Sequence, residues 1–474
     1  MANKKDLAVD ILVPLSGRGG VERVINQAAC FLMEQGWQVR VVQMVYDGQV
    51  WLDARVPFCP LRREKVDDIF DFIPMYAQFM GQTRVPDLVV ATPWPYLALA
   101  ARKALEQLQA YAKVVSWLHG PLEVYKRYEV GGAECVGFAD EAFVLNERTR
   151  ALLERLLPQV PARLVWNPVD FSRCREVSPG NERRLLFVGR LSPEKHVGVV
   201  LEAVAKSRGW RLRIVGSGPE RAALEEQAQA LGLGERVEFS GWQDNPWELA
   251  EGCAGLVLAS EYEAFPLVAI EAMACGLPVF STPVDGVIEL VRPGENGFLF
   301  ERDNSAQLAQ ILDLYADGGL PRIEPEACRA SAARYEAGTA LERLKCALEG
   351  VLDKVSVIVP CCDVSDYLPN CLNSVFEQQV NFNLEVICVD DGSTDRTQDV
   401  LMEWEARFPE ELLVIPLEER GGAQKARGIA LQYATGNYIV YAGAQDVFLP
   451  GELKGMYEAM RGQGLAAAEK GMCQ

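Results

Sequence analysis

The sequence predicts an α/β protein in which parallel sheets are covered by helices. Short apolar strand segments alternate with helical patterns along the whole chain, which is typical of parallel α/β layers. The alternation falls into three series, at residues 1–170, 171–351 and 352–474. A prior of about 150 residues per domain also predicts roughly three domains for a chain of 474 residues.

The first series opens with a strand at residues 6–15, the glycine turn SGRGG and a helix at residues 21–36. Apolar residues recur in that helix at helical spacing, at Val21, Val24, Ile25, Ala28 and Leu32. Further strands are expected at residues 37–44, 86–92, 112–118, 141–146 and 163–168. The series ends near Asp170.

A polar link at residues 171–183 leads to the second series. Its strands are expected at residues 184–191, 211–218, 236–242, 255–260 and 278–282, and its last two helices at residues 304–318 and 340–353. The third series follows at once, with strands at residues 354–360, 384–391, 412–417 and 437–443. It looks cut short beside the other two.

The composition is ordinary for a soluble globular protein, with 49% hydrophobic and 24% charged residues. The net charge is −19, and the acidic excess lies mainly after residue 170. Because phosphate backbones are bound by clustered Lys and Arg, nucleic acid is not expected as a partner. The near-neutral first series is the part least repelled by an anionic membrane, so any peripheral membrane contact is expected there.

Cysteine usage and the first apolar segment both indicate a cytoplasmic protein. The 13 cysteines are scattered, without a C-x-x-C pair, which is typical of free thiols in a reducing compartment. The apolar segment after Lys5 is short and interrupted by Asp10, so it predicts a buried strand. No apolar run reaches the roughly 18 residues that a membrane span needs, so at most peripheral contact with the inner face of a membrane is expected.

Two cations lie five residues apart in VGRLSPEKH, at Arg190 and Lys195. The motif follows a predicted strand, and open α/β sheets bind their ligands at the carboxyl ends of strands. Two cations on one such loop can stabilise a diphosphate that gains negative charge as a bond to it breaks. Two unrelated surface cations are the alternative interpretation.

A second motif, EAFPLVAIE, carries Glu263 and Glu271 with seven residues between them. Pro266 suits the first turn of a helix through LVAIEAMA, whose free amides at Leu267 and Val268 would then point at an anion. Glu263 would lie at the mouth of that site, and Glu271 about two turns further on could accept hydrogen bonds from a sugar diol. Two solvated glutamates are the weaker alternative, because the apolar neighbours imply that a carboxylate at 271 needs a buried partner.

Two glycine turns, SGRGGVE and IVGSGPER, do not fit a dinucleotide fingerprint. Glu22 and Arg221 occupy the position of the last glycine, so a nicotinamide enzyme is not predicted. Gly19 and Gly20 would still let the backbone approach a phosphate across a cleft. A tight turn explains the two glycines equally well.

Together these motifs resemble the retaining glycosyltransferases of family four. The matching segments are GGVERV, NPVD, GRLSPEKH, GSGPE, VEFSGW and the E-x7-E stretch, in family order across the first two series. The resemblance implies the GT-B fold, with two facing Rossmann-like domains. Residues 1–170 would form the acceptor side, and residues 171–351 would hold a nucleotide-diphosphate sugar donor.

The resemblance also assigns roles to the site residues. Arg190 and Lys195 would bind the donor diphosphate, Glu271 the ribose hydroxyls and Glu263 the transferred sugar. Other substrate contacts are expected from the glycine turn, the base-bordering FSGW turn and the start of the donor helix, at Gly19, Gly20, Gly241, Trp242, Phe265, Leu267 and Val268.

Three further residues qualify this assignment. His119 in SWLHGPL would lie near the reactive face of the sugar, with a hydrogen-bonded structural histidine as the alternative. Ala264 replaces the usual family glycine, which would narrow the sugar pocket or tilt its loop. The segments SGWQDNPWEL and SWLHGPL are most similar to enzymes that add galactose or another hexose to lipopolysaccharide cores, although Trp242 and Trp247 could equally be packing residues.

The third series resembles the start of a family two glycosyltransferase with the GT-A fold, in KVSVIVPCCD, CVDDGSTD and ARGIALQYATGNYIVY. The resemblance implies that Asp390 and Asp391, with Pro360, contact a nucleoside, and that a later D-x-D holds a divalent metal. Gly443 and Gln445 stand where those two aspartates belong.

Glycine has no ligand atom, and an amide replaces a carboxylate poorly on a hard cation. Of the acidic residues expected there, only Asp446 is present, one position further on. Residues 352–474 are therefore expected to be an incomplete, non-catalytic GT-A-like domain with at most weak divalent-cation binding.

The sequence thus predicts a retaining hexosyltransferase that moves a hexose from a nucleotide-diphosphate sugar to a glycan or glycolipid, in lipopolysaccharide core or another surface polysaccharide. No Asp, His or Cys cluster with metal-ligand spacing occurs in the first two series, so the GT-B part is expected to need no metal or other cofactor. Two alternatives remain. A sugar-nucleotide epimerase of GT-B architecture would form product without an acceptor, and a non-catalytic nucleotide-sugar-binding protein would bind donor without turnover.

Overall fold

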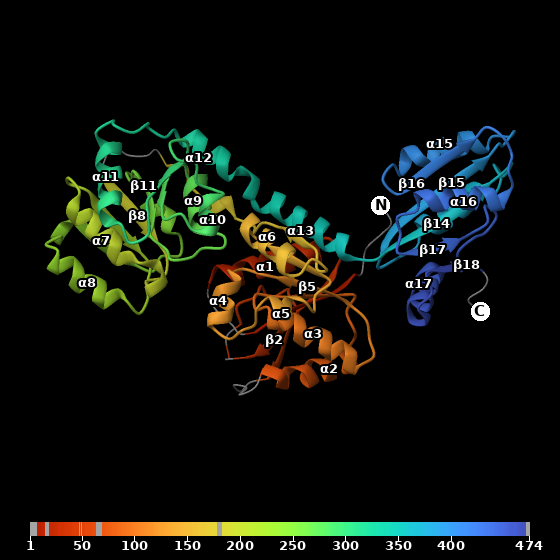
Figure 1. Cartoon of the computed structure of the whole chain (residues 1–474), viewed down its shortest axis with the longest axis horizontal. Helices are drawn as coiled ribbons and strands as arrows, with labels where there is room; N and C mark the ends of the chain where they lie inside the picture. Colours follow the sequence, from red (N-terminus) through yellow and green to blue (C-terminus); the bar gives the residue numbers. More distant parts are fainter. Residues whose placement is uncertain are drawn as a thin grey trace.

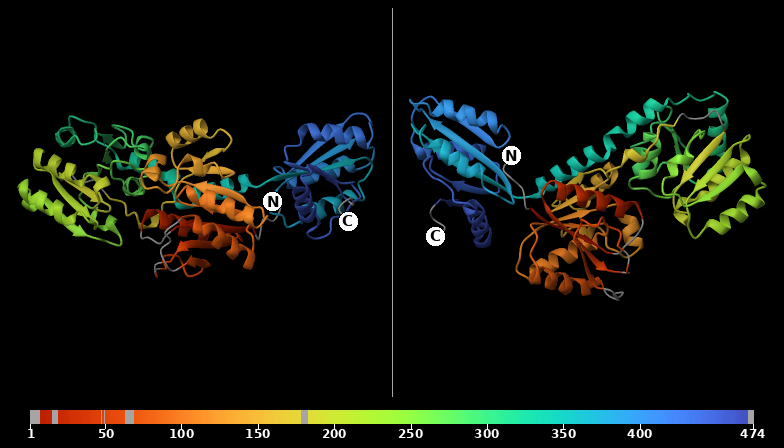
Figure 2. Two further views of the ribbon diagram at one scale, coloured as in Figure 1. Left: turned by 60° about the horizontal axis from the view of Figure 1, so that its bottom comes forward. Right: turned by 180° about the vertical axis from the view of Figure 1, so that it is seen from behind.

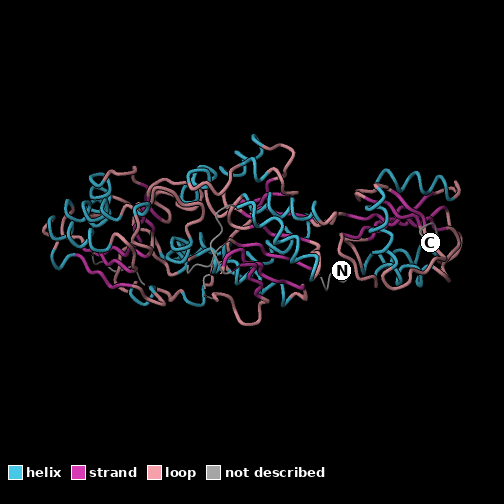
Figure 3. The backbone as a smooth tube through the Cα atoms, turned by 90° about the horizontal axis from the view of Figure 1, so that it is seen from below, coloured by secondary structure: helices cyan, strands magenta, loops and turns pink. Residues whose placement is uncertain are grey.

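The computed structural model describes residues 7–14, 19–46, 48, 50–62, 69–177 and 183–470. Within these residues the chain forms three parallel sheets with helices packed on their faces (Figure 1). The second and third sheets lie on opposite sides of the first, along the longest axis of the molecule (Figure 3). This confirms the predicted α/β class.

The first sheet has the strand order β3-β2-β1-β4-β5-β6-β7. Its strands are β1 (Ala8–Val13), β2 (Gln38–Val45), β3 (Phe58–Arg62), β4 (Leu88–Ala91), β5 (Lys113–Trp117), β6 (Glu141–Val144) and β7 (Ala162–Leu164). Its helices are α1 (Gly20–Glu34), η1 (Ile69–Asp71), α2 (Phe72–Gln82), α3 (Tyr96–Gln107), α4 (Leu122–Arg127), α5 (Ala133–Val136) and α6 (Glu147–Leu156).

Helix α1 packs on this sheet through the apolar face that its sequence predicts. Val24, Ile25, Ala28 and Leu32 are buried in one cluster with β1, β2 and β5. That packing fixes the start of α1, with Gly19 and Gly20, near the carboxyl edge of β1. Strand β3 was not expected from the pattern because it is short and contains Pro60, which is tolerated here at the edge of the sheet.

The second sheet has the order β10-β9-β8-β11-β12-β13. Its strands are β8 (Arg184–Val188), β9 (Arg211–Val215), β10 (Val237–Gly241), β11 (Gly255–Leu258), β12 (Val279–Ser281) and β13 (Gly297–Leu299). The helical segments of this part are η2 (Phe171–Arg173), η3 (Pro193–Lys195), α7 (Val197–Lys206), α8 (Arg221–Ala230), η4 (Gly234–Arg236), η5 (Pro246–Leu249), α9 (Leu267–Ala274), α10 (Asp285–Ile288), α11 (Ser305–Ala316), α12 (Pro325–Ala332), η6 (Ala333–Tyr335) and α13 (Ala337–Val351).

Helix α13 leaves the second sheet and returns to the first. Its residues Leu341, Leu344 and Leu348 belong to the same apolar cluster as β1 and α1. Figure 2 shows the helix crossing the first sheet on its way to the third. The predicted boundaries at 170 and 351 stay predictions, and the packing of α13 joins the first two parts more closely than a simple division by sequence suggests.

The third sheet has the order β16-β15-β14-β17-β18. Its strands are β14 (Lys354–Cys361), β15 (Asn383–Asp391), β16 (Leu412–Leu417), β17 (Tyr438–Tyr441) and β18 (Ala467–Glu469). Its helices are α14 (Leu368–Phe376), α15 (Thr397–Arg407), α16 (Ala423–Tyr433) and α17 (Glu452–Gln463). Apolar clusters on both faces of the sheet give this part a core of its own.

Asp353 joins the third sheet to the first. It lies between α13 and β14, is buried, and accepts an ion pair from Lys113 at 2.8 Å and a hydrogen bond from the Tyr457 hydroxyl at 2.8 Å. Asn381 adds a hydrogen bond to Asp87 at 2.6 Å across the same junction. The third sheet is therefore docked on the first by buried polar contacts.

Replacing Asp353 with alanine is expected to lower the free energy of unfolding by roughly 3 kcal/mol, because Lys113 would lose its counter-charge in a mostly buried site. Urea unfolding followed by tryptophan fluorescence measures this. The matched control is Asp399→Ala, which removes an exposed carboxylate that pairs with Arg396 at 3.8 Å and should change little. Equal unfolding curves for both variants would show that the junction adds no stability.

Two further observations concern the setting of the protein. The cysteines within the described ranges are free thiols. None of the helices in the described part of the chain combines the length and the apolar character that crossing a bilayer requires.

Candidate active site

The loop after β8 brings Lys195 to Glu263. Lys195 ends the short turn η3, and its Nζ donates to Oε1 of Glu263 in the loop between β11 and α9. Ser260 donates to the same oxygen at 2.9 Å. The exposed fractions of the two side chains are 23% for Lys195 and 15% for Glu263. The structure thus brings together Lys195, which is predicted to bind the donor diphosphate, and Glu263, which is predicted to bind the sugar attached to it.

Arg190, the second predicted cation, lies exposed on the same loop. Among the described residues its guanidinium makes no ion pair, whereas the ammonium of Lys195 is paired with Glu263. An exposed, unpaired guanidinium beside a strand end can bind a phosphate without first losing another partner.

Helix α9 begins directly after Pro266 and is buried over most of its length. The Leu267 amide donates to the Phe265 carbonyl at 2.9 Å, so it is not free as the sequence predicts. For the Val268 amide no acceptor is found among the described residues. Phe265 packs edge-on against Tyr335 at 5.4 Å between ring centroids, which fixes the chain just before the helix.

Gly20, at the start of α1, lies against the start of α9. A Cβ atom built on Gly20 would lie 2.7 Å from Cδ1 of Leu267, so a side chain there would require the Leu267 side chain to move. Gly19 caps α1, and its amide donates to Glu22 at 2.9 Å. Gly20 therefore lies in contact with α9, and an approach of the Gly19 and Gly20 backbone to a phosphate stays a prediction.

Glu271 has the buried partner that its sequence context requires. Its Oε1 accepts an ion pair from Nη2 of Arg23 on α1 at 2.7 Å, across the two domains. Burial raises the pKa of Glu271, and Arg23 and Arg173 oppose that shift. The sequence context of Glu271 predicts that it needs a partner, but it does not identify Arg23 as that partner.

His119 follows β5 and is not held by a structural hydrogen bond of its ring. Neither Nδ1 nor Nε2 has a partner in the described residues, although both are buried. The ring packs on Trp117 at 4.6 Å between centroids, and burial lowers the pKa of His119 to about 3. The imidazole is therefore neutral at physiological pH and has one donor and one acceptor unused.

The two tryptophans of the predicted base-binding segment differ in environment. Trp242 is 66% exposed and follows Gly241, whose φ of +71° favours glycine. Trp247 is buried in the core of the second domain, and its side chain also hydrogen-bonds to Glu271. Arg173 of η2 donates to the carbonyl of Asp244, which lies between these two tryptophans, and so holds their segment against η2.

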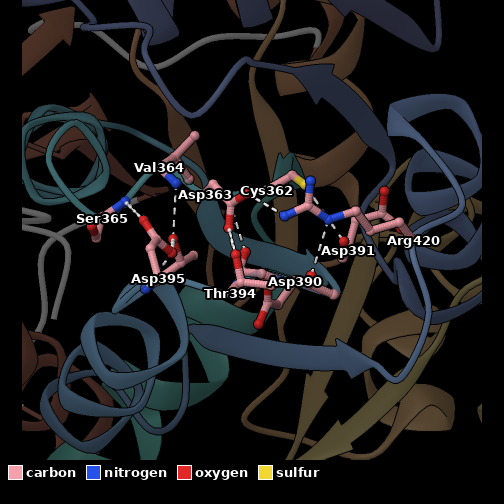
Figure 4. A network of polar contacts seen from close by, with 12 residues as sticks. Cys362, Asp363, Val364, Ser365, Asp390, Asp391, Thr394, Asp395 and Arg420 are labelled. Atoms are coloured by element: carbon pink, nitrogen blue, oxygen red, sulfur yellow. Dashed lines mark hydrogen bonds and ion pairs between the residues drawn. The ribbon is translucent and has the colours of Figure 1, made fainter.

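The acidic loop at the end of β15 binds its own backbone (Figure 4). Both carboxylate oxygens of Asp391 accept amides, from Gly421 and Gly422, at 2.7 Å each. Asp390 accepts the Ser393 amide at 3.2 Å. These two predicted nucleoside ligands lie together at the carboxyl edge of the third sheet, where Asp391 orders the loop before α16.

A second set of contacts closes the same loop. The Thr394 amide and the Arg420 guanidinium both bind Asp363, and together they lower its pKa. Pro360 is the penultimate residue of β14 and pairs in register with Val389 of β15, directly before Asp390. The loop is thus ordered by internal hydrogen bonds and one ion pair.

The region that replaces the D-x-D motif also pairs internally. The Gly443 amide donates to Asp446 at 2.6 Å, and Gln445 is exposed. Across the described ranges, no three His, Cys, Asp or Glu side chains are grouped so that they could hold a metal ion.

Two family profiles match the chain in the positions of the second and third sheets. Residues 169–333 match the family described as "Glycosyl transferases group 1", and residues 356–468 match "Glycosyl transferase family 2". The chain is a glycosyltransferase. The group 1 match contains Arg190, Lys195, Glu263 and Glu271, and the family 2 match contains the acidic loop.

Similar proteins agree with this assignment. The "Lipopolysaccharide 1,6-galactosyltransferase" of Escherichia coli K12 is 26% identical over 352 residues, covering 70% of this glycosyltransferase and 94% of the relative. The enzyme of the same description from Salmonella typhimurium is 28% identical over 316 residues, covering 60% and 83%.

Solved structures show the GT-B fold. The "lipopolysaccharide outer core galactosyltransferase WaaB apo form" superposes with a TM-score of 0.63 at 22% identity, over 73% of this chain and all of that one. Anabaena HepE in complex with UDP and glucose superposes with a TM-score of 0.61 at 20% identity, over 72% and 99%. The predicted fold of facing Rossmann-like domains is therefore confirmed for the first two sheets.

Proposed function

We propose that residues 1–351 form a retaining hexosyltransferase that uses a nucleotide-diphosphate sugar. The contact between Lys195 and Glu263 at the carboxyl edge of the second sheet carries this proposal, because it joins a diphosphate-binding cation to a sugar-binding carboxylate. Lipopolysaccharide core or another surface glycan is the proposed acceptor, since relatives are named for galactose transfer to lipopolysaccharide. A similar solved structure holds UDP and glucose, which supports a nucleotide-sugar donor.

In the proposed reaction, the bond between the anomeric carbon and the terminal phosphate oxygen of the donor breaks. Its electron pair leaves with the nucleoside diphosphate, and Arg190, Lys195 and the Val268 amide stabilise the developing charge. The acceptor hydroxyl oxygen bonds to the anomeric carbon on the same face, and its proton passes to the leaving phosphate oxygen. Configuration at the anomeric carbon is therefore retained.

His119 is the proposed contact to the transferred sugar from the first domain. Its two buried ring nitrogens need partners, because an unsatisfied buried polar atom is costly. One sugar hydroxyl can donate to the unprotonated ring nitrogen, and a second can accept from the ring N–H. Glu263 would approach the same sugar from the second domain, so the hexose would be held from both sides.

The proposed chemistry uses the cations of the second domain where other enzymes use a divalent metal. We infer that the third domain is not a second catalytic centre, because Gly443 and Gln445 replace the metal ligands and Asp391 is engaged with backbone amides. A cytoplasmic location, with the near-neutral first domain approaching a glycolipid at the membrane, belongs to the same proposal.

Transfer can be tested with UDP-galactose, UDP-glucose and the matching GDP sugars, using truncated lipopolysaccharide cores as acceptors. The expected product is a glycoside whose anomeric configuration by proton NMR equals that of the donor. Activity in EDTA should stay within about twofold of the untreated enzyme, because cations and amides supply the stabilising charge. A new sugar nucleotide formed without acceptor would favour an epimerase, and UDP-sugar binding without turnover would favour a binding protein.

A further inference from the structure

One ion pair crosses directly from the first domain to the donor-binding helix of the second. Arg23 lies near the start of α1 and Glu271 lies inside α9, with 2.7 Å between Nη2 and Oε1. The Glu271 side chain is 11% exposed, whereas that of Arg23 is 43% exposed. The contact therefore places a flexible cation from one domain on a mostly buried carboxylate of the other.

We propose that Arg23 is a positioning residue that holds Glu271 ready for the ribose of the donor and thereby couples closure of the two domains to nucleotide binding. This inference rests on the proposed function, which gives Glu271 the ribose hydroxyls. Arg23 contacts one carboxylate oxygen, and a carboxylate has about four lone-pair positions, so acceptor capacity remains for a diol.

Ribose hydroxyls are bound best by an ionised carboxylate, and burial opposes ionisation. Two charged groups lower the pKa of Glu271 and so favour its ionised form, Arg23 from α1 and Arg173 from η2. The Trp247 side chain also hydrogen-bonds to Glu271 and acts in the same direction. The thiol of Cys275 lies directly after the same helix. Among these groups, Arg23 makes the ion pair with Glu271.

Helix α12 also packs on α9, but its arginine is engaged elsewhere. Arg329 pairs with Glu326 at 2.6 Å and reaches Glu176 at 4.0 Å. Arg23 therefore supplies the direct counter-charge of Glu271 from outside the second domain.

The start of α1 makes a second contact with α9. Gly20, one turn before Arg23, lies against Leu267 at the start of α9. Separating the domains would remove both contacts together and leave Glu271 without its ion pair. Nucleotide binding should then favour the closed arrangement, and closure should favour nucleotide binding, because such coupling is reciprocal.

The experiment measures binding of UDP to the full chain by calorimetry. Arg23→Met is expected to weaken UDP binding about tenfold at neutral pH, and Arg23→Lys to restore most of the loss. The matched control is Arg148→Met, which removes a different ion pair between the domains, to Asp285 at 2.6 Å, without touching Glu271. It should leave UDP affinity within about twofold if the effect belongs to Glu271 rather than to closure in general.

A pH series separates positioning from simple loss of structure. Burial raises the pKa of Glu271 and Arg23 counteracts this, so removing Arg23 should raise the pKa further. The ionised fraction then falls at higher pH, and Arg23→Met should lose UDP affinity earlier than the wild type on titration from about pH 8 to about pH 5. In a Glu271→Gln background, Arg23→Met should add little, because the shared carboxylate is gone.

Three results would overturn the proposal. The first is tighter UDP binding by Arg23→Met, which would mean that Arg23 competes with ribose. The second is unchanged UDP binding by Arg23→Met at every pH. The third is an equal loss of UDP affinity in Arg23→Met and Arg148→Met. If the wild-type protein binds no UDP but transfers sugar from another nucleotide sugar, the same binding measurements are made with the diphosphate of that nucleotide, and the same three results would overturn the proposal. Wild-type protein that neither binds nucleotide nor transfers sugar would overturn the proposed function itself, and the inference with it.

Discussion

Lys195→Met is expected to lower the rate of hexose transfer by about two to three orders of magnitude. Methionine keeps the length and apolar character of the stem but removes the ammonium that would neutralise the leaving diphosphate. The loss should appear in kcat, since the charge on the diphosphate grows most in the transition state. UDP affinity should fall as well, by about tenfold, because the product carries the same charge.

The matched control is Lys206→Met on the neighbouring helix α7. Lys206 contacts Ser305 at 2.6 Å and Glu202 at 3.4 Å, away from the site, so its removal should leave kcat within about twofold. Transfer by Lys195→Met at nearly the wild-type rate would exclude Lys195 from diphosphate binding. Arg190, which is unpaired in the described structure, would then be the next candidate.

Local sequence was sufficient where a short motif determines both structure and chemistry. Glu263 and Glu271 were recognisable because the spacing between them spans one helix with a proline before it. The structure brings Glu263 to Lys195, although 68 positions separate them, because strands β8 and β11 are neighbours in the sheet and end at the same edge. Their roles as ligands stay predictions.

Arg23 shows what such motifs cannot reveal. It is 248 positions from Glu271, and nothing in GGVERV marks Arg23, in the first turn of α1, as a partner for a distant helix. The pairing depends on how two domains sit against each other, which the periodicity of either one does not determine. The same applies to α13, whose apolar face predicts a helix but not which core it joins.

Short edge strands were missed for a different physical reason. Strands β13 and β18 contain three residues each, too few for an alternating pattern to stand out from a loop. Their pairing is decided by the neighbouring strands β12 and β17 that they extend. Such elements follow from tertiary contacts and not from intrinsic propensity.

The third domain separates fold from chemistry. Its apolar core includes residues of β14, β15 and β17, and neither Gly443 nor Gln445 belongs to that core. A sheet of this kind can therefore keep its family two fold after the D-x-D carboxylates are replaced. The acidic loop likewise keeps its shape because Asp363 and Asp391 bind amides of the chain itself.

Glu263→Gln is expected to reduce hexose transfer about a hundredfold while leaving UDP affinity within about threefold. The amide keeps the size of the side chain and can still accept from Ser260, but it loses the negative charge that pairs with Lys195 and faces the proposed sugar site. This pattern differs from that of Lys195→Met, for which binding and turnover should both fall. Comparing kcat with UDP affinity for each variant therefore assigns the carboxylate to the sugar and the ammonium to the diphosphate.

The neighbouring glutamate supplies the control for this prediction. Glu261 lies in the same loop but faces Arg127 at 3.7 Å and Arg302 at 3.9 Å, so Glu261→Gln should keep most activity. Because Lys195 and Glu263 are in contact, the double variant should lose less than the product of the two single losses. Fully multiplicative losses would mean that the two groups act independently, and a loss of UDP affinity in Glu263→Gln equal to its loss of turnover would place this carboxylate on the nucleotide instead of the sugar.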